Sequence, residues 1–151
     1  MEGSSDPIPS TPFCQGIPEK VFSQTLIAEF NNIDSVKSLL ARHAGEVGVL
    51  IVEPILLNCS MIKPQNGFLR QVLDVCKEHD VVVVFDLVKI NTAIAMKNIT
   101  KYWASVSTDC PSGPDMFTFG KGLSGGACPI GAIGMTEEFA RIIESKRVQV
   151  L

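Results

Sequence analysis

Two apolar segments of this chain each end at an ionisable residue. The run Val81–Phe85 is followed by Asp86, and the run Met116–Phe119 is followed, after one glycine, by Lys121. In open parallel sheets, ligands bind at the carboxyl ends of the strands. If the two runs are neighbouring strands, their axes lie roughly 5 Å apart. We therefore expect a carboxylate and an amine to flank a planar ring at one edge of the sheet.

The chemistry of this pair predicts a pyridoxal phosphate site. A lysine held in a dehydrated pocket is present as the free amine and can form a Schiff base with an aldehyde. An aspartate that faces the pyridine nitrogen keeps it protonated, so that the ring withdraws electrons. Val88 is expected on the same side of an extended chain as Asp86, under the ring. Glycines 120, 122, 125 and 126 would let the backbone approach closely around Lys121.

The rest of the chain supplies alternating elements that can position these residues. Residues 1–18 hold four prolines and are interpreted as an irregular lead-in. Strand and helix patterns then alternate, which predicts an α/β fold with a mostly parallel sheet and flanking helices. The expected strands are Thr25–Phe30, a buried Val47–Val52, a central Val81–Phe85 covered by helices on both faces, Met116–Phe119 and Pro129–Met135. The expected helices are Asn32–Ala44, Phe68–His79 and a last one after Thr136.

Five strings of residues, in this order, carry a family resemblance. They are Val-Leu-Ile-Val-Glu-Pro (49–54), Lys-Pro-Gln-Asn-Gly-Phe-Leu (63–69), Val-Phe-Asp-Leu-Val (84–88), Pro-Asp-Met-Phe-Thr-Phe-Gly-Lys-Gly-Leu-Ser-Gly-Gly (114–126) and Pro-Ile-Gly-Ala-Ile-Gly (129–134). Together they resemble the class III pyridoxal-phosphate-dependent aminotransferases. Within that family the chain is most similar to glutamate-1-semialdehyde 2,1-aminomutase, over roughly residues 15–145.

The resemblance implies a fold-type-I enzyme that works as a homodimer on a small amino acid or amino aldehyde. It implies that Lys121 forms the internal aldimine with pyridoxal 5'-phosphate and that Asp86 pairs with the pyridinium. It also implies that Val88 packs on the ring and that Asn58 lies near the cofactor. Residues 19–151 would then be part of the large domain, while the phosphate-binding segments and the small C-terminal domain fall outside these 151 residues.

The sequence departs from the family pattern beside Asp86. Leu87 stands where the family usually has Glu, and Lys89-Ile-Asn-Thr-Ala93 stands where it commonly has Met-Thr-Gly-Phe-Arg. These changes leave substrate recognition open. One alternative is a class III transaminase that acts on an ω-amine. The other, which follows from the missing phosphate-binding segments, is a catalytically inactive truncated remnant or subunit-interaction fragment.

Composition excludes several other classes. The net charge is −3, from 13 basic and 16 acidic residues without a basic patch, so nucleic acid is not an expected partner. The apolar runs are too short to span a membrane, and the first residues lack the layout of a secretion signal. Five cysteines without a C-x-x-C pair predict reduced, cytoplasmic thiols and no metal site.

A dinucleotide-binding loop is a further alternative. Gly120-x-Gly122-x-x-Gly125 matches the glycine fingerprint and follows an expected strand. That fingerprint must also open a helix. The residues after it show no helical apolar pattern, so the sequence argues against a nucleotide site.

Overall fold

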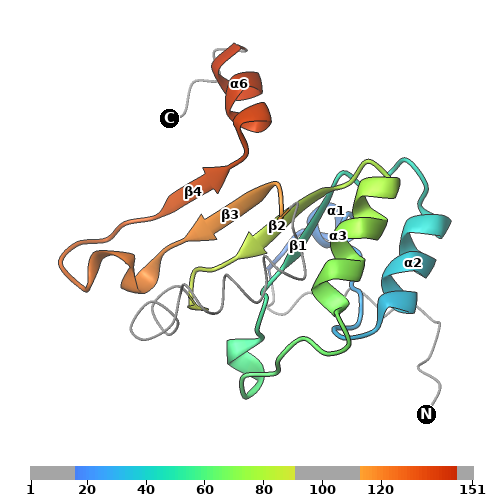
Figure 1. The fold of residues 1–151 in the computed structure, drawn as a ribbon, viewed down its shortest axis with the longest axis horizontal. Coiled ribbons are helices and arrows are strands. Elements are labelled where there is room, and N and C mark those ends of the chain that lie inside the picture. Colours follow the sequence, from blue (N-terminus) through green and yellow to red (C-terminus); the bar gives the residue numbers. More distant parts are fainter. Residues whose placement is uncertain (1–15, 91–112, 146–151) are drawn as a thin grey trace.

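The computed structural model of the chain describes residues 16–90 and 113–145, and it contains a four-stranded sheet flanked by helices (Figure 1). The strand order is β1-β2-β3-β4, with β1, β2 and β3 parallel and β4 antiparallel to β3. The strands are β1 (Val49–Val52), β2 (Val82–Asp86), β3 (Met116–Phe119) and β4 (Ala132–Met135). The sheet is thus mostly parallel, as the alternating pattern predicts.

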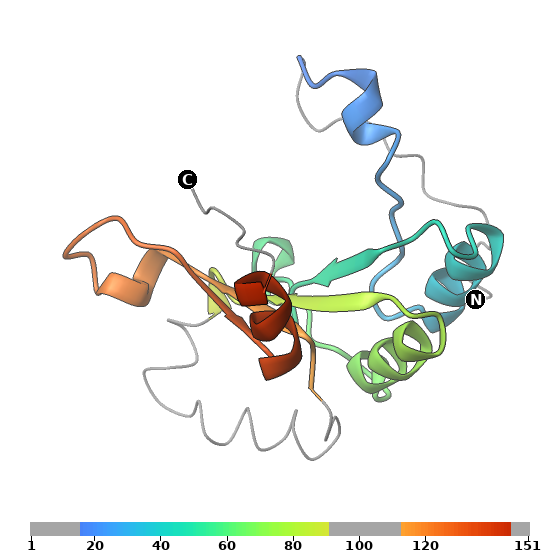
Figure 2. The same cartoon turned by 90° about the horizontal axis from the view of Figure 1, so that it is seen from above.

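In two views at right angles, the longer helices of the first half of the chain lie beside β1 and β2, and the last helix lies beyond β4 (Figures 1 and 2). The helices are α1 (Glu19–Phe22), α2 (Ile33–Arg42), α3 (Phe68–Glu78), α6 (Glu137–Ser145) and the 3-10 turns η1 (Leu57–Cys59) and η2 (Lys121–Ser124). The start of α2 is fixed by Asn32, whose side chain accepts a hydrogen bond from the Ser35 N–H at 3.1 Å. In the part of the chain that the structure describes, no helix is long and apolar enough to cross a membrane.

One face of the sheet packs against α3 and forms the core. The strand register places Leu50, Val83, Phe85 and Phe117 on this face, and Phe85 is fully buried. Around them lies one apolar cluster that includes Val36, Leu40, Phe68, Leu69, Val72, Leu73, Val75, Cys76 and Leu87. Burial of these side chains supplies the main stabilisation of the fold.

The opposite face is open at several apolar positions. Val49 and Ile51 of β1 are 48% and 66% exposed, and Ile133 of β4 is 63% exposed. The prediction of a fully buried strand over Val47–Val52 is therefore wrong, because only every second side chain of β1 points into the core. At Val49, Ile51 and Ile133 the described residues cover only one face of the sheet.

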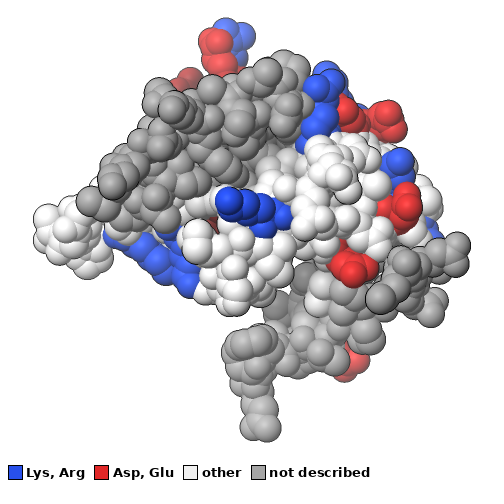
Figure 3. Space-filling view, turned by 60° about the horizontal axis from the view of Figure 1, so that its bottom comes forward, with Lys and Arg blue, Asp and Glu red and all other residues white. Residues whose placement is uncertain are grey.

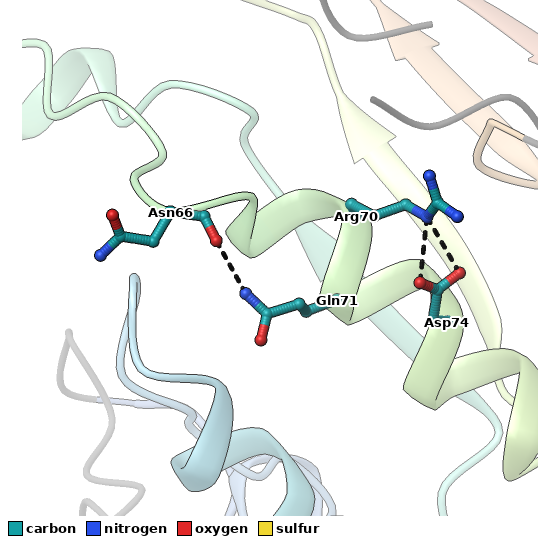
Figure 4. A network of polar contacts seen from close by, with 4 residues as sticks. All are labelled: Asn66, Arg70, Gln71 and Asp74. Atoms are coloured by element: carbon teal, nitrogen blue, oxygen red, sulfur yellow. Dashed lines mark hydrogen bonds and ion pairs between the residues drawn. The ribbon is translucent and has the colours of Figure 1, made fainter. Parts of the chain in front are cut away.

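A short polar loop leads into α3 and is fixed at both ends. Asn31 bonds the backbone on both sides of Pro64, donating to the Lys63 carbonyl at 3.0 Å and accepting from the Gln65 N–H at 2.9 Å. The Gln71 side chain donates to the Asn66 carbonyl at 2.9 Å, one turn from the Arg70–Asp74 ion pair (Figure 4). Gly67 adopts φ +69° at the entry of the helix, which suits a residue without a side chain.

Thr25–Phe30 does not form the predicted strand. The described backbone there has a single bridge residue, Ile27. The Glu29 N–H donates to the Ser35 hydroxyl at 3.1 Å, and the Glu29 carbonyl accepts from the Asn32 N–H. These groups serve the start of α2 and are therefore not available to a sheet. Most of the predicted lead-in, residues 1–15, lies outside the described residues.

Candidate active site

Asp86 and Lys121 lie after the carboxyl ends of neighbouring parallel strands. Asp86 is the last residue of β2 and pairs in register with Thr118 of β3, three residues before Lys121. The Leu87 N–H extends this pairing with a 2.9 Å bond to the Thr118 carbonyl. The predicted adjacency of the two strands is confirmed.

The Asp86 carboxylate is held by two hydrogen bonds to one of its oxygens. Oδ1 accepts from the Val88 N–H at 2.8 Å and from the Thr118 hydroxyl at 3.2 Å. Oδ2 has no hydrogen-bond partner among the described residues, so it is available to a ligand. The bond to Val88 also makes the chain turn after Asp86. The expectation that Val88 continues an extended chain is therefore wrong.

Val88 instead packs against the segment that carries Lys121. A Cβ built on Gly120 would lie 3.3 Å from Val88 Cγ1 and 3.8 Å from the Ile130 carbonyl oxygen. Only a residue without a side chain allows this approach without displacing Val88. We expected glycines to let the backbone approach closely around Lys121. This is confirmed for Gly120, whose backbone approaches Val88 of the candidate site.

Lys121 begins η2 in a left-handed backbone conformation. Its φ is +48°, which for a residue with a side chain costs roughly 1–2 kcal/mol. Backbone strain of this kind concentrates at functional sites. The side chain is exposed, so the described residues do not form the dehydrated pocket that the sequence suggests. Among the described residues, Lys121 shares this edge of the sheet with the segment that follows β2 and with the β3–β4 connection.

Asn58 lies in η1, after the carboxyl end of β1, and contacts the segment that follows β2. Its Oδ1 accepts a hydrogen bond from Lys89 Nζ. The predicted site residues therefore occur at the ends of three adjacent parallel strands. Asn58 lies on the β1 side of Asp86 and Lys121 on the β3 side.

Asp115 fixes the register of β2 and β3 from their other end. Its Oδ2 accepts from the Val83 N–H at 2.7 Å, and its own N–H donates to the Val83 carbonyl at 3.0 Å. Burial, and secondarily the negative charge of Asp115, raises the pKa of the Cys76 thiol to about 11. Cys76 is thus an inert core thiol at neutral pH.

Thr118 holds the Asp86 carboxylate, and Asp115 fixes the pairing of β2 with β3. The sequence motifs assigned a role to neither residue. Both contacts depend on strand register, which pairs residues about 30 positions apart in the chain. Thr118 could have been identified from the sequence as a polar residue inside an otherwise apolar strand. The glycine fingerprint does not open a helix, because η2 is a four-residue 3-10 turn that leads to β4.

The mostly parallel sheet with flanking helices matches the large domain of class III aminotransferases. Residues 7–148 match the family described as Aminotransferase class-III. The chain belongs to this family, whose members use pyridoxal phosphate.

Its similarities among known proteins are as follows. The chain is 30% identical over 141 residues to glutamate-1-semialdehyde 2,1-aminomutase 2 of Lachnoclostridium phytofermentans, covering 93% of this chain and 31% of that protein. It is 35% identical over 127 residues to the aminomutase of Francisella philomiragia, covering 84% and 28%. An omega-transaminase from Sphaerobacter thermophilus shares the fold with a TM-score of 0.74 at 22% identity, over 91% and 29% of the two chains. The chain thus spans less than a third of the curated relatives it matches.

Proposed function

We propose that this chain serves pyridoxal-phosphate-dependent amino-group transfer of the glutamate-1-semialdehyde aminomutase kind. In this proposal Lys121 attaches the cofactor, Asp86 faces its ring nitrogen, Val88 packs on the ring and Asn58 lies beside it. Residues 19–151 then form part of a large domain that acts in the cytoplasm as a homodimer, on a small amino acid or amino aldehyde. The observation that carries the proposal is the register of β2 and β3, which brings Asp86 and the Lys121 segment to one edge.

The residues present fit the cofactor. Asp86 offers Oδ2 as an acceptor while two donors hold Oδ1 in place. The contact between Gly120 and Val88 provides an apolar surface for a flat ring, and the Lys121 amine is accessible. When bound, pyridoxal phosphate supplies an aldehyde for a primary amine and a ring that withdraws electrons.

Each residue has a separate task in this arrangement. Lys121 Nζ would provide the primary amine for the aldehyde of the bound cofactor, and the same nitrogen would hold or release a proton. Asp86 Oδ2 would accept a hydrogen bond from the ring nitrogen and so favour its protonated form. Thr118 and the Val88 N–H keep the carboxylate in the required orientation. Val88 orients the ring by packing against it.

The test is covalent labelling of the full chain. The protein is incubated with pyridoxal phosphate, reduced with borohydride and mapped by peptide mass spectrometry. We expect an adduct on Lys121 and an absorbance band at about 420 nm before reduction, as this cofactor gives with lysine amines. Because Lys121 is exposed, we expect weak attachment and negligible turnover of the chain alone.

Two variants make the labelling decisive. Lys121→Ala should lose the adduct and the band, whereas Lys77→Met, which removes an exposed lysine on α3, should keep both. A label spread over exposed lysines, or retained in full by Lys121→Ala, would overturn the assignment of Lys121.

A second candidate function is that of a non-catalytic fragment that associates with another subunit. The observation in its favour is the exposed apolar side chains of Val49 and Ile51 on β1 and Ile133 on β4. Size-exclusion chromatography with light scattering separates the two functions. A stable assembly without any Lys121 adduct would favour the fragment, and an adduct specific to Lys121 would favour the enzyme.

A further inference from the structure

Lys89 joins the ends of two strands through a neutral partner. Its Nζ donates to Asn58 Oδ1, and the two residues are 31 positions apart. Lys89 follows β2 and Asn58 follows β1, and these strands are parallel neighbours. The contact therefore lies at the same carboxyl edge of the sheet as Asp86.

The positive charge of Lys89 is not balanced within the described part of the chain. Its partner Asn58 is an uncharged amide. The ion pairs of the described residues are His43–Glu46, Arg70–Asp74 and Glu137–Arg141, and none involves Lys89. Lys89 is also half-buried, so solvent screens its charge only in part. A cation in this setting is stabilised by an anionic ligand.

Asn58 adds a second donor at the same place. Because its Oδ1 is directed to Lys89, its Nδ2 amide group lies beside the ammonium group and has no partner among the described residues. An ammonium and an amide N–H₂ side by side provide charged and neutral donors for one group of oxygens. Carboxylates and phosphates present such oxygens.

The distribution of charged side chains on the lower side of the molecule can be compared with this pair of donors. Figure 3 brings the lower side of Figure 1 forward, and there Lys and Arg side chains lie within uncharged surface. Most of the acidic side chains visible in that view lie toward its right-hand side. Basic side chains near the middle of that view are surrounded by uncharged surface, whereas those on the right lie beside acidic side chains.

We propose that Lys89 and Asn58 form an oxyanion-binding subsite of the candidate active site. Its ligand is a carboxylate of the amino substrate or the phosphate of the cofactor, and both have the same recognition chemistry. This rests on the proposed function, which places the reacting amine on the opposite, β3 side of Asp86. A ligand that reaches Lys121 with one end can then place an anionic end at Lys89.

The test measures anion binding without the cofactor. The full chain, labelled with ¹⁵N, is titrated with glutarate and separately with inorganic phosphate, and the Asn58 side-chain amide signals are followed. We expect saturable shifts whose dissociation constant rises at least fivefold in Lys89→Met and changes less than twofold in Lys89→Arg. Lys77→Met is the matched control, because Lys77 is an exposed lysine on α3.

A second variant keeps the proposal falsifiable if Lys89→Met does not fold. Asn58→Asp keeps an acceptor for Lys89 but neutralises the positive charge of Lys89. Because this variant lacks the Asn58 side-chain amide, the Lys89 backbone amide signal is followed instead, and it should shift with anion in the wild-type chain but not in Asn58→Asp. Stronger binding of glutarate assigns the subsite to a substrate carboxylate, and stronger binding of phosphate assigns it to the cofactor. Absence of saturable shifts with both anions, or equal binding in Lys89→Met, overturns the proposal.

The outcome is independent of the labelling at Lys121. Lys121→Ala should keep the anion-dependent shifts although it cannot attach pyridoxal phosphate. Anion binding without an adduct would therefore contradict the proposed function alone, and an adduct without anion binding would contradict the subsite alone.

Discussion

Thr118 lies opposite Asp86 in the adjacent parallel strand, and its hydroxyl donates to Asp86 Oδ1 at 3.2 Å. The Val88 N–H donates to the same oxygen at 2.8 Å. Both internal donors therefore use one carboxylate oxygen and leave the other for a ligand. The orientation of Asp86 thus depends on a strand neighbour and on its own turn, without help from Lys121.

Replacing Thr118 tests this relationship. Thr118→Val removes the hydroxyl but keeps the β-branched shape, so we expect the free energy of unfolding to fall by about 1 kcal/mol, the usual value of one partly buried hydrogen bond. Urea unfolding followed by circular dichroism measures it. Thr118→Ser restores a hydroxyl and should recover at least half of the loss. Equal stability of the Val variant and the wild-type chain would show that the bond contributes nothing.

The left-handed backbone of Lys121 gives a second prediction. Lys121→Gly relieves a φ of +48°, but it also makes the unfolded chain more flexible, so the net gain should be about 0.5–1 kcal/mol. Lys121→Ala keeps the strain and should leave the free energy of unfolding within about 0.5 kcal/mol of the wild-type value. If the Gly variant is less stable than the Ala variant, the strain inferred at this residue is absent.

The sequence allowed the strands that matter for the site to be predicted, because β-branched and aromatic runs such as Val81–Phe85 leave few other ways to bury their side chains. The prediction for Met116–Phe119 agrees with β3 at both ends. Since both strands are parallel and adjacent, the meeting of Asp86 and the Lys121 segment followed from the strand ends alone. The family resemblance pointed to the same two residues.

The features that could not be predicted from the sequence depend on contacts between residues that are distant in the chain or on hydrogen bonds at turns. Thr25–Phe30 has a strand-like composition, but its backbone groups bond to Ser35 and Asn32. Val88 was placed by an alternation rule that fails once Asp86 caps the following turn. The role of Thr118 depends on register, which no local pattern encodes.

The buried thiol of Cys76 gives a pH-dependent prediction. Burial, and then the negative charge of Asp115, raises its pKa to about 11 in the folded chain, against 9.0 for an exposed thiol. The folded state therefore favours the protonated thiol. Its contribution to stability is complete below about pH 9 and is lost as the pH rises toward 11.

Two measurements check the behaviour of Cys76. Between pH 8 and pH 10 the free energy of unfolding of the wild-type chain should fall by about 1 kcal/mol more than that of Cys76→Ala. Iodoacetamide at pH 8 should modify the exposed Cys59 and leave Cys76 unmodified until the chain unfolds. Rapid modification of Cys76 in the folded chain would contradict its burial.

The contact between Gly120 and Val88 gives the last prediction. In Gly120→Ala the new Cβ would lie 3.3 Å from Val88 Cγ1, so Val88 must move by a few tenths of an ångström. We expect a loss of about 1 kcal/mol in the free energy of unfolding, at the low end for overpacking because Val88 is only half-buried. The Val88 amide signal should shift, because its hydrogen bond to Asp86 Oδ1 moves with it. Gly131→Ala is the matched control, since its Cβ would meet only the Phe119 carbonyl oxygen at an ordinary 3.6 Å. If the two variants change the Val88 signal equally, the close approach of Gly120 does not position Val88.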